Sequence, residues 1–289
     1  MRPNPFDKLR VKKSLGQNFL RNPDVVRDIV SAAHLAVTPP RGGMTAGENV
    51  LEVGPGEGVL TEALLSTGAN VIAIEKDDRL IESLRKKFPA AKIIHGDILN
   101  SHLPFTIYDL PFKIVANIPY YITGKFLRNI FSSEHLPERV VLLLQKEVAL
   151  RILGIDAKRP ERSRGTKESI LSISVKAYGT PSIIRYVPRE DFEPVPKVDS
   201  AVLVIEKISR KFFQEVKPPL GGFTSKQVAE QKFFDLVKRG FAHKRKKLVG
   251  NLTTPGVQWT PGVWEHLGNK RAEELSLDDW RTLFLELEA

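Results

Sequence analysis

Two short segments of the chain carry the groups best suited to chemistry on an amino group. The first, Asn117-Ile118-Pro119-Tyr120, follows the apolar run 113–116, which predicts a buried strand that ends in a loop. Proline lacks an N–H and holds the residue before it in an extended conformation. The Asn117 carboxamide and nearby carbonyl oxygens can then accept hydrogen bonds from an exocyclic NH2, while Tyr120 stacks on the attached base. For these four residues alone, an ordinary proline turn is the competing interpretation.

The second segment is glycine-rich. Gly54-Pro-Gly56-Glu-Gly58 follows the strand-like run 49–53 and precedes an amphipathic helix, an order that opens a doubly wound α/β domain. Glycines there let the backbone approach a ligand closely. A hydride-transfer enzyme would carry a third glycine three residues after the second, but position 59 is valine. With Glu52 before it, the pattern is the form seen in S-adenosylmethionine-dependent methyltransferases.

Further strands are expected at 71–74, 92–95 and 140–144, and two of them end on carboxylates, Glu75 and Asp97. Ligands of open α/β sheets lie at the carboxyl ends of the strands, so we expect these side chains to share one edge with Gly54 and Asn117. Glu75 stands about twenty residues after the first glycine, where an acidic residue reaches ribose hydroxyls. Asp97 can accept from an adenine amine. Capping the following helix is the other possible role of Glu75, but the aspartates at 77 and 78 are better placed for it.

The remaining chain predicts two more strands, at 182–184 and 201–205, joined by the proline-rich crossing loop 191–200. After residue 206 the strand pattern stops, and helices are expected, the last two around 261–267 and 277–287. We therefore predict an α/β fold: a Rossmann-like class I methyltransferase sheet with helices on both faces, plus a small C-terminal all-α domain. The expected boundaries are 1–210 for the catalytic domain and 211–289 for a helical, basic RNA-binding domain.

The net charge of +10 indicates a polyanionic partner. The positive charge gathers near residues 10–13, 158–167 and 238–247, and no acidic residue occurs between 236 and 252. A solvated helix face is the competing interpretation. The residues expected to bind RNA are Lys12, Lys13, Lys244, Arg245, Lys246 and Lys247.

The absence of cysteine excludes disulfides, thiolate metal sites and a cysteine nucleophile. No apolar run approaches the roughly 18 residues of a membrane span, and the polar, basic residues 1–13 do not form a secretory signal. We expect a cytoplasmic monomer that uses neither a metal nor a membrane.

An ordered set of motifs resembles the KsgA/Dim1 family, the ribosomal small-subunit RNA adenine N6,N6-dimethyltransferases, over nearly the whole chain. The motifs are Gln17-Asn-Phe-Leu20, Glu52-Val-Gly-Pro-Gly56, Gly96-Asp97, Asn117-Ile-Pro-Tyr120, Gln145-Lys-Glu-Val-Ala149, Phe192-x-Pro-x-Pro-x-Val-Asp-Ser-Ala201 and Phe241-Ala-His-Lys-Arg-Lys-Lys-Leu248. The resemblance implies an S-adenosylmethionine site lined by Asn18, Leu20, Gly54, Glu75, Asp97 and Asn117. It implies two adjacent adenosines in the 3′-terminal hairpin of small-subunit rRNA as the substrate, each methylated twice at N6 during maturation of the small subunit. The chain departs from the family pattern at Glu168-Ser169, where many members have Tyr-Gly before the strand expected near 170–172.

The expected mechanism is in-line displacement at the donor methyl. The Asn117 carboxamide oxygen and the Pro119 carbonyl would orient N6, while Tyr120 stacks on the extruded base and Phe192 closes its other face. Three alternatives remain open: a large-subunit rRNA methyltransferase of the macrolide-resistance type, a non-catalytic ribosome assembly factor, and a DNA amino-methyltransferase. The basic helical tail argues against the first, and the intact cofactor motifs argue against the second. The third usually places proline directly after asparagine.

Overall fold

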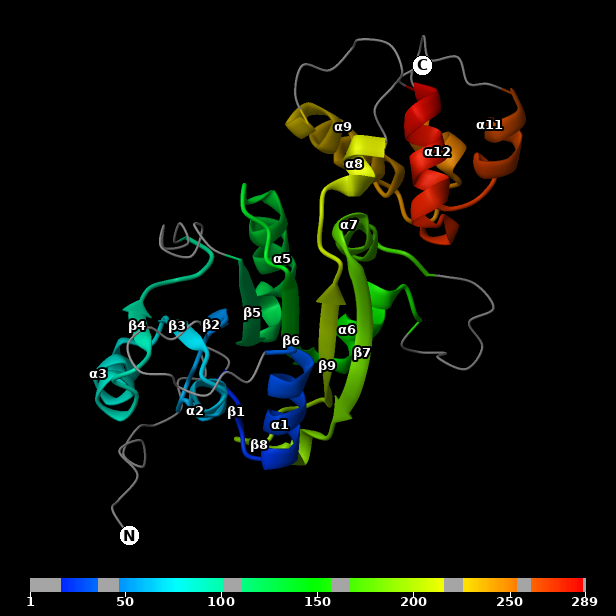
Figure 1. Ribbon diagram of the computed structural model, residues 1–289. Coiled ribbons are helices and arrows are strands. Elements are labelled where there is room, and N and C mark those ends of the chain that lie inside the picture. The colour runs from blue at the N-terminus through cyan, green and yellow to red at the C-terminus, as the bar shows by residue number, and fades with distance from the viewer. Residues whose placement is uncertain are drawn as a thin grey trace. The chain divides into compact units, whose positions relative to one another are not determined.

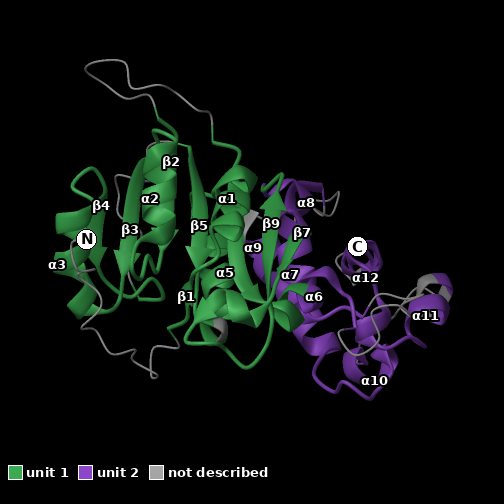
Figure 2. Ribbon diagram, turned by 90° about the horizontal axis from the view of Figure 1, so that it is seen from below, with its two compact units in different colours: residues 1–149, 182–208 green, residues 150–181, 209–289 purple. Residues whose placement is uncertain are grey.

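The computed structural model describes residues 17–35, 47–100, 111–156, 167–215, 226–253 and 261–287. The chain divides into two compact units, one of residues 1–149 and 182–208, the other of residues 150–181 and 209–289 (Figure 2). Residues 150–181 thus belong with the C-terminal helices, although they lie inside the range 1–210 expected for the catalytic domain. The division of functions between those two ranges stays a prediction.

The first unit is built on a seven-stranded sheet with the order β4-β3-β2-β5-β6-β9-β7 (Figure 1). Its strands are β2 (Asn49–Val53), β3 (Asn70–Glu75), β4 (Lys92–His95), β5 (Phe112–Asn117), β6 (Arg139–Gln145), β7 (Thr180–Val187) and β9 (Ser200–Glu206). The five strands from β4 to β6 pair in parallel, and β9 pairs antiparallel with β6. The chain winds outward from β2 to β3 and β4, then returns to place β5 on the other side of β2. This reversal between β2 and β5 makes the crevice where α/β sheets bind ligands.

Helices α1 (Pro23–Ala32), α2 (Val59–Ser66) and α3 (Asp78–Lys87) share one core with one face of the sheet. Alternate strand residues point to the opposite face, as the period of a β-strand requires. There α5 (Thr123–Ser132) runs alongside β5 in both ribbon views and buries four apolar side chains (Figures 1 and 2). The first helix begins as the sequence predicts, with Asn22 accepting from the Asp24 N–H at 2.9 Å ahead of Pro23.

Two short strands bring the predicted crossing loop to the start of the described chain. β1 (Phe19–Leu20) pairs antiparallel with β8 (Phe192–Glu193), so that Leu20 stands opposite Phe192. One turn of 3-10 helix, η3 (Arg189–Asp191), precedes β8. The segment 191–200 therefore is not loop throughout, because its first residues complete a two-stranded sheet.

The second unit is helical: α7 (Ile170–Tyr178), α8 (Lys211–Glu215), α9 (Lys226–Gly240), α10 (Leu248–Leu252), α11 (Pro261–Leu267), η4 (Ala272–Glu274) and α12 (Leu277–Leu287). The division of the chain after residue 149 falls within α6 (Lys146–Leu153). The strand expected near 170–172 is wrong: these residues open α7, because Ser169 and Ser172 form a capping box that starts a helix. The two closing helices are confirmed. Fully buried aromatic rings, among them Phe213, Phe233 and Trp280, fill the core of this unit.

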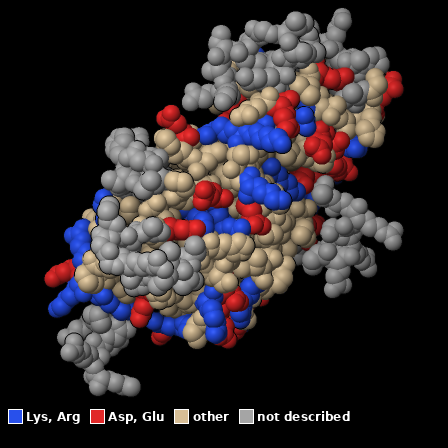
Figure 3. All heavy atoms as spheres, viewed as in Figure 1, with Lys and Arg blue, Asp and Glu red and all other residues tan. Residues whose placement is uncertain are grey.

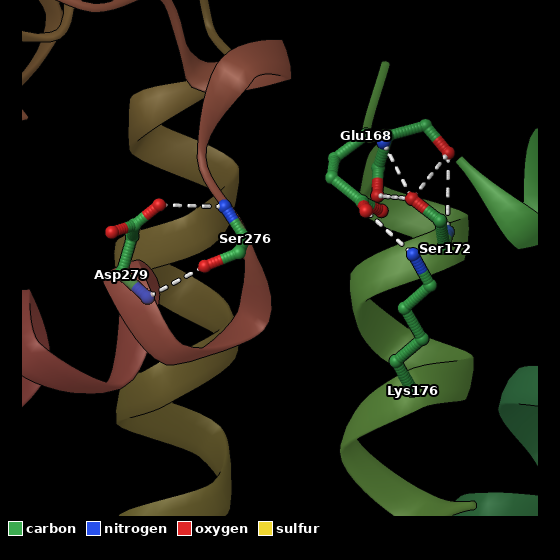
Figure 4. Close-up of polar contacts among 6 residues, drawn as sticks. Glu168, Ser172, Lys176, Ser276 and Asp279 are labelled. Carbon is green, nitrogen blue, oxygen red and sulfur yellow. Dashed lines mark hydrogen bonds and ion pairs between the residues drawn. The ribbon is translucent and has the colours of Figure 1, made fainter. Parts of the chain in front are cut away.

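Polar contacts at two helices of this unit are drawn in Figure 4. The Glu168 side chain is 2% exposed and pairs with Lys176 at 2.5 Å, while the Glu168 N–H donates to the Glu273 carbonyl at 2.7 Å. At the start of α12, the Ser276 N–H donates to Asp279 at 2.9 Å, and the Asp279 N–H donates back to the Ser276 hydroxyl at 3.1 Å. These reciprocal bonds satisfy N–H groups that a helix start leaves unpaired.

No helix among the described residues is both long enough and apolar enough to cross a bilayer. The same residues contain no group of three or more His, Cys, Asp or Glu side chains placed to hold a metal ion.

Candidate functional site: a pocket at the carboxyl edge of the sheet

One pocket opens where β2, β3, β4 and β5 end. Its volume is about 1080 Å³ when the open space at its mouth is included. Residues of all four strand ends line it. Every residue predicted for the cofactor lies on its wall: Asn18, Leu20, Gly54, Glu75, Asp97 and Asn117.

The glycine loop forms the floor because its backbone takes positive φ angles. Gly54 has a φ of +70°, and a Cβ built on it would stand 3.5 Å from the Asn117 carbonyl oxygen. Gly58 has a φ of +83°, and a Cβ there would lie 2.1 Å from the Phe88 ring. The first glycine therefore keeps the pocket wall thin, whereas the third lets α2 and α3 pack closely.

Glu75 ties the glycine loop to the next strand. Its two carboxylate oxygens accept from the Gly56 N–H at 3.1 Å and the Asp77 N–H at 2.8 Å. Burial raises the pKa of Glu75, and these N–H donors oppose the shift. Asp77 caps α3 and also accepts from Gln17 at 2.8 Å. The sequence argument assigned the helix cap to an aspartate rather than to Glu75, and Asp77 is indeed the cap. Glu75 contributes to the pocket wall instead.

Asp97 forms an ion pair with Lys76, a residue that the sequence analysis overlooked. The Lys76 ammonium binds its Oδ2 at 2.9 Å, and the Leu99 N–H donates to Oδ1 at 3.0 Å. Burial pulls the pKa of Asp97 upward, but the Lys76 and Leu99 hydrogen bonds and the nearby Lys125 together leave it below its usual value. Lys76 directly follows Glu75, so its position next to a predicted pocket residue could have identified it from the sequence.

Asn117 ends β5 on the wall of the pocket. Its Nδ2 donates to the Asn18 carbonyl at 3.4 Å, which turns its Oδ1 away from that carbonyl. The Pro119 carbonyl accepts from the Ile122 N–H at 3.1 Å, and since a carbonyl has two lone pairs it can accept once more. Tyr120 begins the single turn of η2 (Tyr120–Ile122), but its side chain lies outside the described part of the structure.

Phe192 is not brought to the pocket wall. Its side chain is 2% exposed and belongs to the core cluster with Leu20 and Val25. β8 turns it inward because its neighbour Glu193 faces solvent, where it pairs with Arg21. In this arrangement the Phe192 ring offers almost no surface to a base, and its stacking role stays a prediction.

Arg21 is a second residue that the sequence analysis missed. Its guanidinium binds Glu57 of the glycine loop at 2.5 Å and Glu193 of β8 at 3.0 Å. It therefore holds β1, and with it Asn18 and Leu20, against the loop. No local pattern marks it, because its partners stand 36 and 172 positions away.

The predicted RNA-binding residues lie apart in sequence from the pocket. Those from Lys244 to Lys247 are all exposed, in the turn between α9 and α10 of the second unit. Lys12 and Lys13 lie outside the described residues. On the face shown in Figure 3, basic side chains are interspersed with acidic ones and form no single continuous surface.

The sheet order and the pocket at its switch point give the first unit the architecture of the Rossmann-like methyltransferases. Solved structures show the same architecture. The 23S rRNA methyltransferase ErmE matches with a TM-score of 0.68 at 26% identity, covering 94% of this chain and 100% of that one. A dimethyladenosine transferase from Plasmodium falciparum matches with a TM-score of 0.69 at 24% identity, covering 92% and 95%, and supports the fold.

Sequence comparison then gives the family. The profile of the family described as ribosomal RNA adenine dimethylase matches residues 8–289, and the chain belongs to this family. The ribosomal RNA small subunit methyltransferase A of Dehalococcoides mccartyi (strain CBDB1) is 38% identical over 96% of this chain and 89% of its own length. Its counterpart from Lactiplantibacillus plantarum (strain ATCC BAA-793 / NCIMB 8826 / WCFS1) is 35% identical over 95% and 89%. The resemblance found in the motifs is thereby confirmed.

Proposed function

We propose that this enzyme transfers methyl groups from S-adenosylmethionine to N6 of two adjacent adenosines in the 3′-terminal hairpin of small-subunit rRNA, as part of small-subunit maturation. The observation that carries the proposal is the approach of Gly54 to Asn117: a Cβ on the first would touch the carbonyl of the second. A ligand on the glycine floor therefore lies beside the side chain expected to hold the amino group.

The pocket suits this cofactor. Backbone that approaches closely at Gly54 suits the methionine end, and the Glu75 carboxylate suits the ribose hydroxyls. Asp97, at the end of β4, suits the adenine amine. S-adenosylmethionine supplies an electrophilic methyl group on a positively charged sulfur. The chain itself has to orient the acceptor nitrogen toward that methyl and keep water from competing.

Asn117 and the Pro119 carbonyl are placed to orient the nitrogen. With Nδ2 directed to Asn18, the Asn117 carboxamide presents an oxygen to an incoming NH2 group. Two acceptors on the amino protons favour a more tetrahedral nitrogen whose lone pair points at the methyl group. Because the Ile122 N–H also binds the Pro119 carbonyl, we expect the bond from N6 to Pro119 to be the weaker one. Tyr120 remains the expected stacking partner of the base.

A large-subunit rRNA target is the second candidate, favoured by the structural likeness to ErmE at 26% identity. The small-subunit target is favoured by sequence relatives of higher identity whose names state it. Mapping N6,N6-dimethyladenosine in both rRNAs of cells with and without this protein separates the two. Loss of the modification from the large-subunit rRNA alone would contradict the proposal.

Asn117→Ala tests the proposed role. We expect methyl transfer to immature small subunits to fall by at least a hundredfold, while S-adenosylhomocysteine binds with little change. Asn49→Ala is the matched control, because Asn49 also donates a carboxamide hydrogen bond to a backbone carbonyl, that of Pro111 at 3.2 Å, at the amino end of β2. Full activity of Asn117→Ala would overturn the role. Absence of transfer by the unaltered protein would favour a non-catalytic assembly factor.

A further inference from the structure

An exposed tyrosine lines the pocket without a role in the proposed mechanism. The Tyr121 side chain is 67% exposed, the highest value among the large apolar residues that are exposed in the described structure. It nevertheless belongs to the pocket wall, together with Ile98 and Ile122. A large ring held open to solvent at the mouth of a pocket can be covered by a flat ligand at little cost.

The ring stands at the Asp97 end of the pocket, because α5 is attached to the segment after β4. Asn129 of α5 donates to the Leu99 carbonyl at 3.1 Å. One turn earlier on this helix, Lys125 is close enough to help lower the pKa of Asp97. Tyr121 stands four positions before Lys125, in the 3-10 turn η2 that leads directly into α5.

Lys76 is a second residue that relates the position of Tyr121 to Asp97. Its ammonium binds Asp97 at 2.9 Å. The pKa of Lys76 is raised, chiefly by this hydrogen bond, and the Tyr121 hydroxyl lies close enough to contribute. Lys76, Asp97 and Tyr121 thus line the same pocket, with Lys76 held on Asp97.

We propose that Tyr121 stacks on the adenine of the bound cofactor and closes the pocket over it, with the stem of Lys76 completing the closure. This inference rests on the proposed function, since it assigns the adenine to Asp97. Tyrosine presents a flat apolar face to any base, so its contribution is to affinity for the adenosine end of the ligand.

A base of the RNA is the other flat ligand that reaches this pocket, but the position of the ring favours the cofactor. The amino group to be methylated belongs beside Asn117, at the end of β5. Asp97 follows β4, which β3 and β2 separate from β5, about 14 Å across the sheet. A ring gathered with Lys76 and Asp97 thus lies toward the end of the pocket away from the methyl acceptor.

Binding of S-adenosylhomocysteine, measured by calorimetry without RNA, tests the proposal. We expect Tyr121→Ala to raise the Kd about tenfold and Tyr121→Phe to change it less than twofold, because the ring and not the hydroxyl makes the contact. Tyr186→Ala is the matched control: this tyrosine of β7 is 52% exposed, lies in the same unit and does not line the pocket. Its Kd should equal that of the unaltered protein.

Nuclear Overhauser effects give a readout independent of affinity. In the complex we expect contacts from the adenine H2 and H8 protons to a tyrosine ring, and these contacts should vanish in Tyr121→Leu. An unchanged Kd in Tyr121→Ala, with a raised KM for the RNA substrate, would overturn the inference and assign the ring to RNA. If the unaltered protein bound no S-adenosylhomocysteine, the proposed function itself would fail. Thermal unfolding of each variant verifies that it is folded.

Discussion

The Thr61 hydroxyl donates a hydrogen bond of 2.6 Å to Oε2 of Glu52 beneath the glycine loop. Glu52 is fully buried, and its Oε1 has no hydrogen-bond partner in the described structure. Burial raises the pKa of this carboxyl to about 8, the nearby Glu75 adds to the shift, and the Thr61 hydroxyl opposes it. Glu52 is therefore mostly protonated and neutral at pH 7, unlike an ordinary glutamate.

Glu52→Gln is expected to remove a pH dependence of stability. The folded state holds the Glu52 proton more tightly than the unfolded state, so the free energy of unfolding falls as the pH rises from about 4.5 to about 8. The upper limit is about 1.4 kcal/mol per pH unit for one group. Glutamine keeps an acceptor for Thr61 and carries no charge. The variant should match the unaltered protein near pH 4.5 and exceed it in stability, by an increasing margin, up to pH 8.

Chemical denaturation followed by circular dichroism at several pH values measures this difference. Glu82→Gln, on the exposed face of α3, is the control and should show no comparable margin. Equal stability of Glu52→Gln and the unaltered protein at pH 8 would mean that the carboxyl is ionised in the fold.

Gly54→Ala should mainly weaken cofactor binding, whereas Gly58→Ala should mainly destabilise the fold. A methyl group at Gly54 meets only the Asn117 carbonyl at 3.5 Å, so we expect a cost of about 1–2 kcal/mol from the positive φ and a loss of cofactor affinity. A methyl at Gly58 would collide with the Phe88 ring, so the cost to folding should be larger, about 3 kcal/mol or more. Thermal unfolding with and without S-adenosylhomocysteine distinguishes them. A Gly58→Ala variant as stable as Gly54→Ala would contradict this assignment.

Lys176→Met should destabilise the second unit. It would leave the Glu168 carboxylate, 2% exposed, without the ammonium that now lies 2.5 Å away (Figure 4). Removing one partner of a buried pair costs about 3–5 kcal/mol. The control is Lys167→Met, whose lysine is 50% exposed and pairs with Asp156 at 3.2 Å; exposed pairs contribute under about 1 kcal/mol. Melting temperatures and limited proteolysis report the effect, and equal losses in the two variants would refute it.

The basic turn between α9 and α10 can be tested by salt dependence. The double variant Lys244→Gln, Lys246→Gln should weaken RNA binding. The negative slope of log K against log salt should become less steep by about 1 to 2, since each lost phosphate contact contributes about 0.7–0.9. Lys211→Gln is the control, because that exposed lysine lies near Glu215 at 3.7 Å. Filter binding at several salt concentrations gives the slopes. An unchanged slope would mean that the turn does not contact RNA.

The sequence by itself determined the main strands and the pocket residues at their ends. Alternating strands and helices placed Gly54, Glu75, Asp97 and Asn117 at strand ends, and in a parallel sheet these ends meet on one edge. The motif order also determined the family, which the comparison over residues 8–289 confirmed. Local start signals, such as Asn22 before Pro23, were sufficient for the first helix.

Tertiary contacts decided the rest, because they join residues that no sequence window brings together. Residues 170–172 form a helix in the second unit, where α7 packs on α8, α9 and α12, and their short apolar run had suggested a strand. Phe192 turns into the core because β8 pairs with β1, 172 positions earlier. Lys76, Asp97 and Tyr121 line one pocket only because the chain brings the ends of β3 and β4 and the turn before α5 to the same edge of the sheet. Spacing along a chain fixes which face a side chain takes, whereas its partners depend on how distant elements pack.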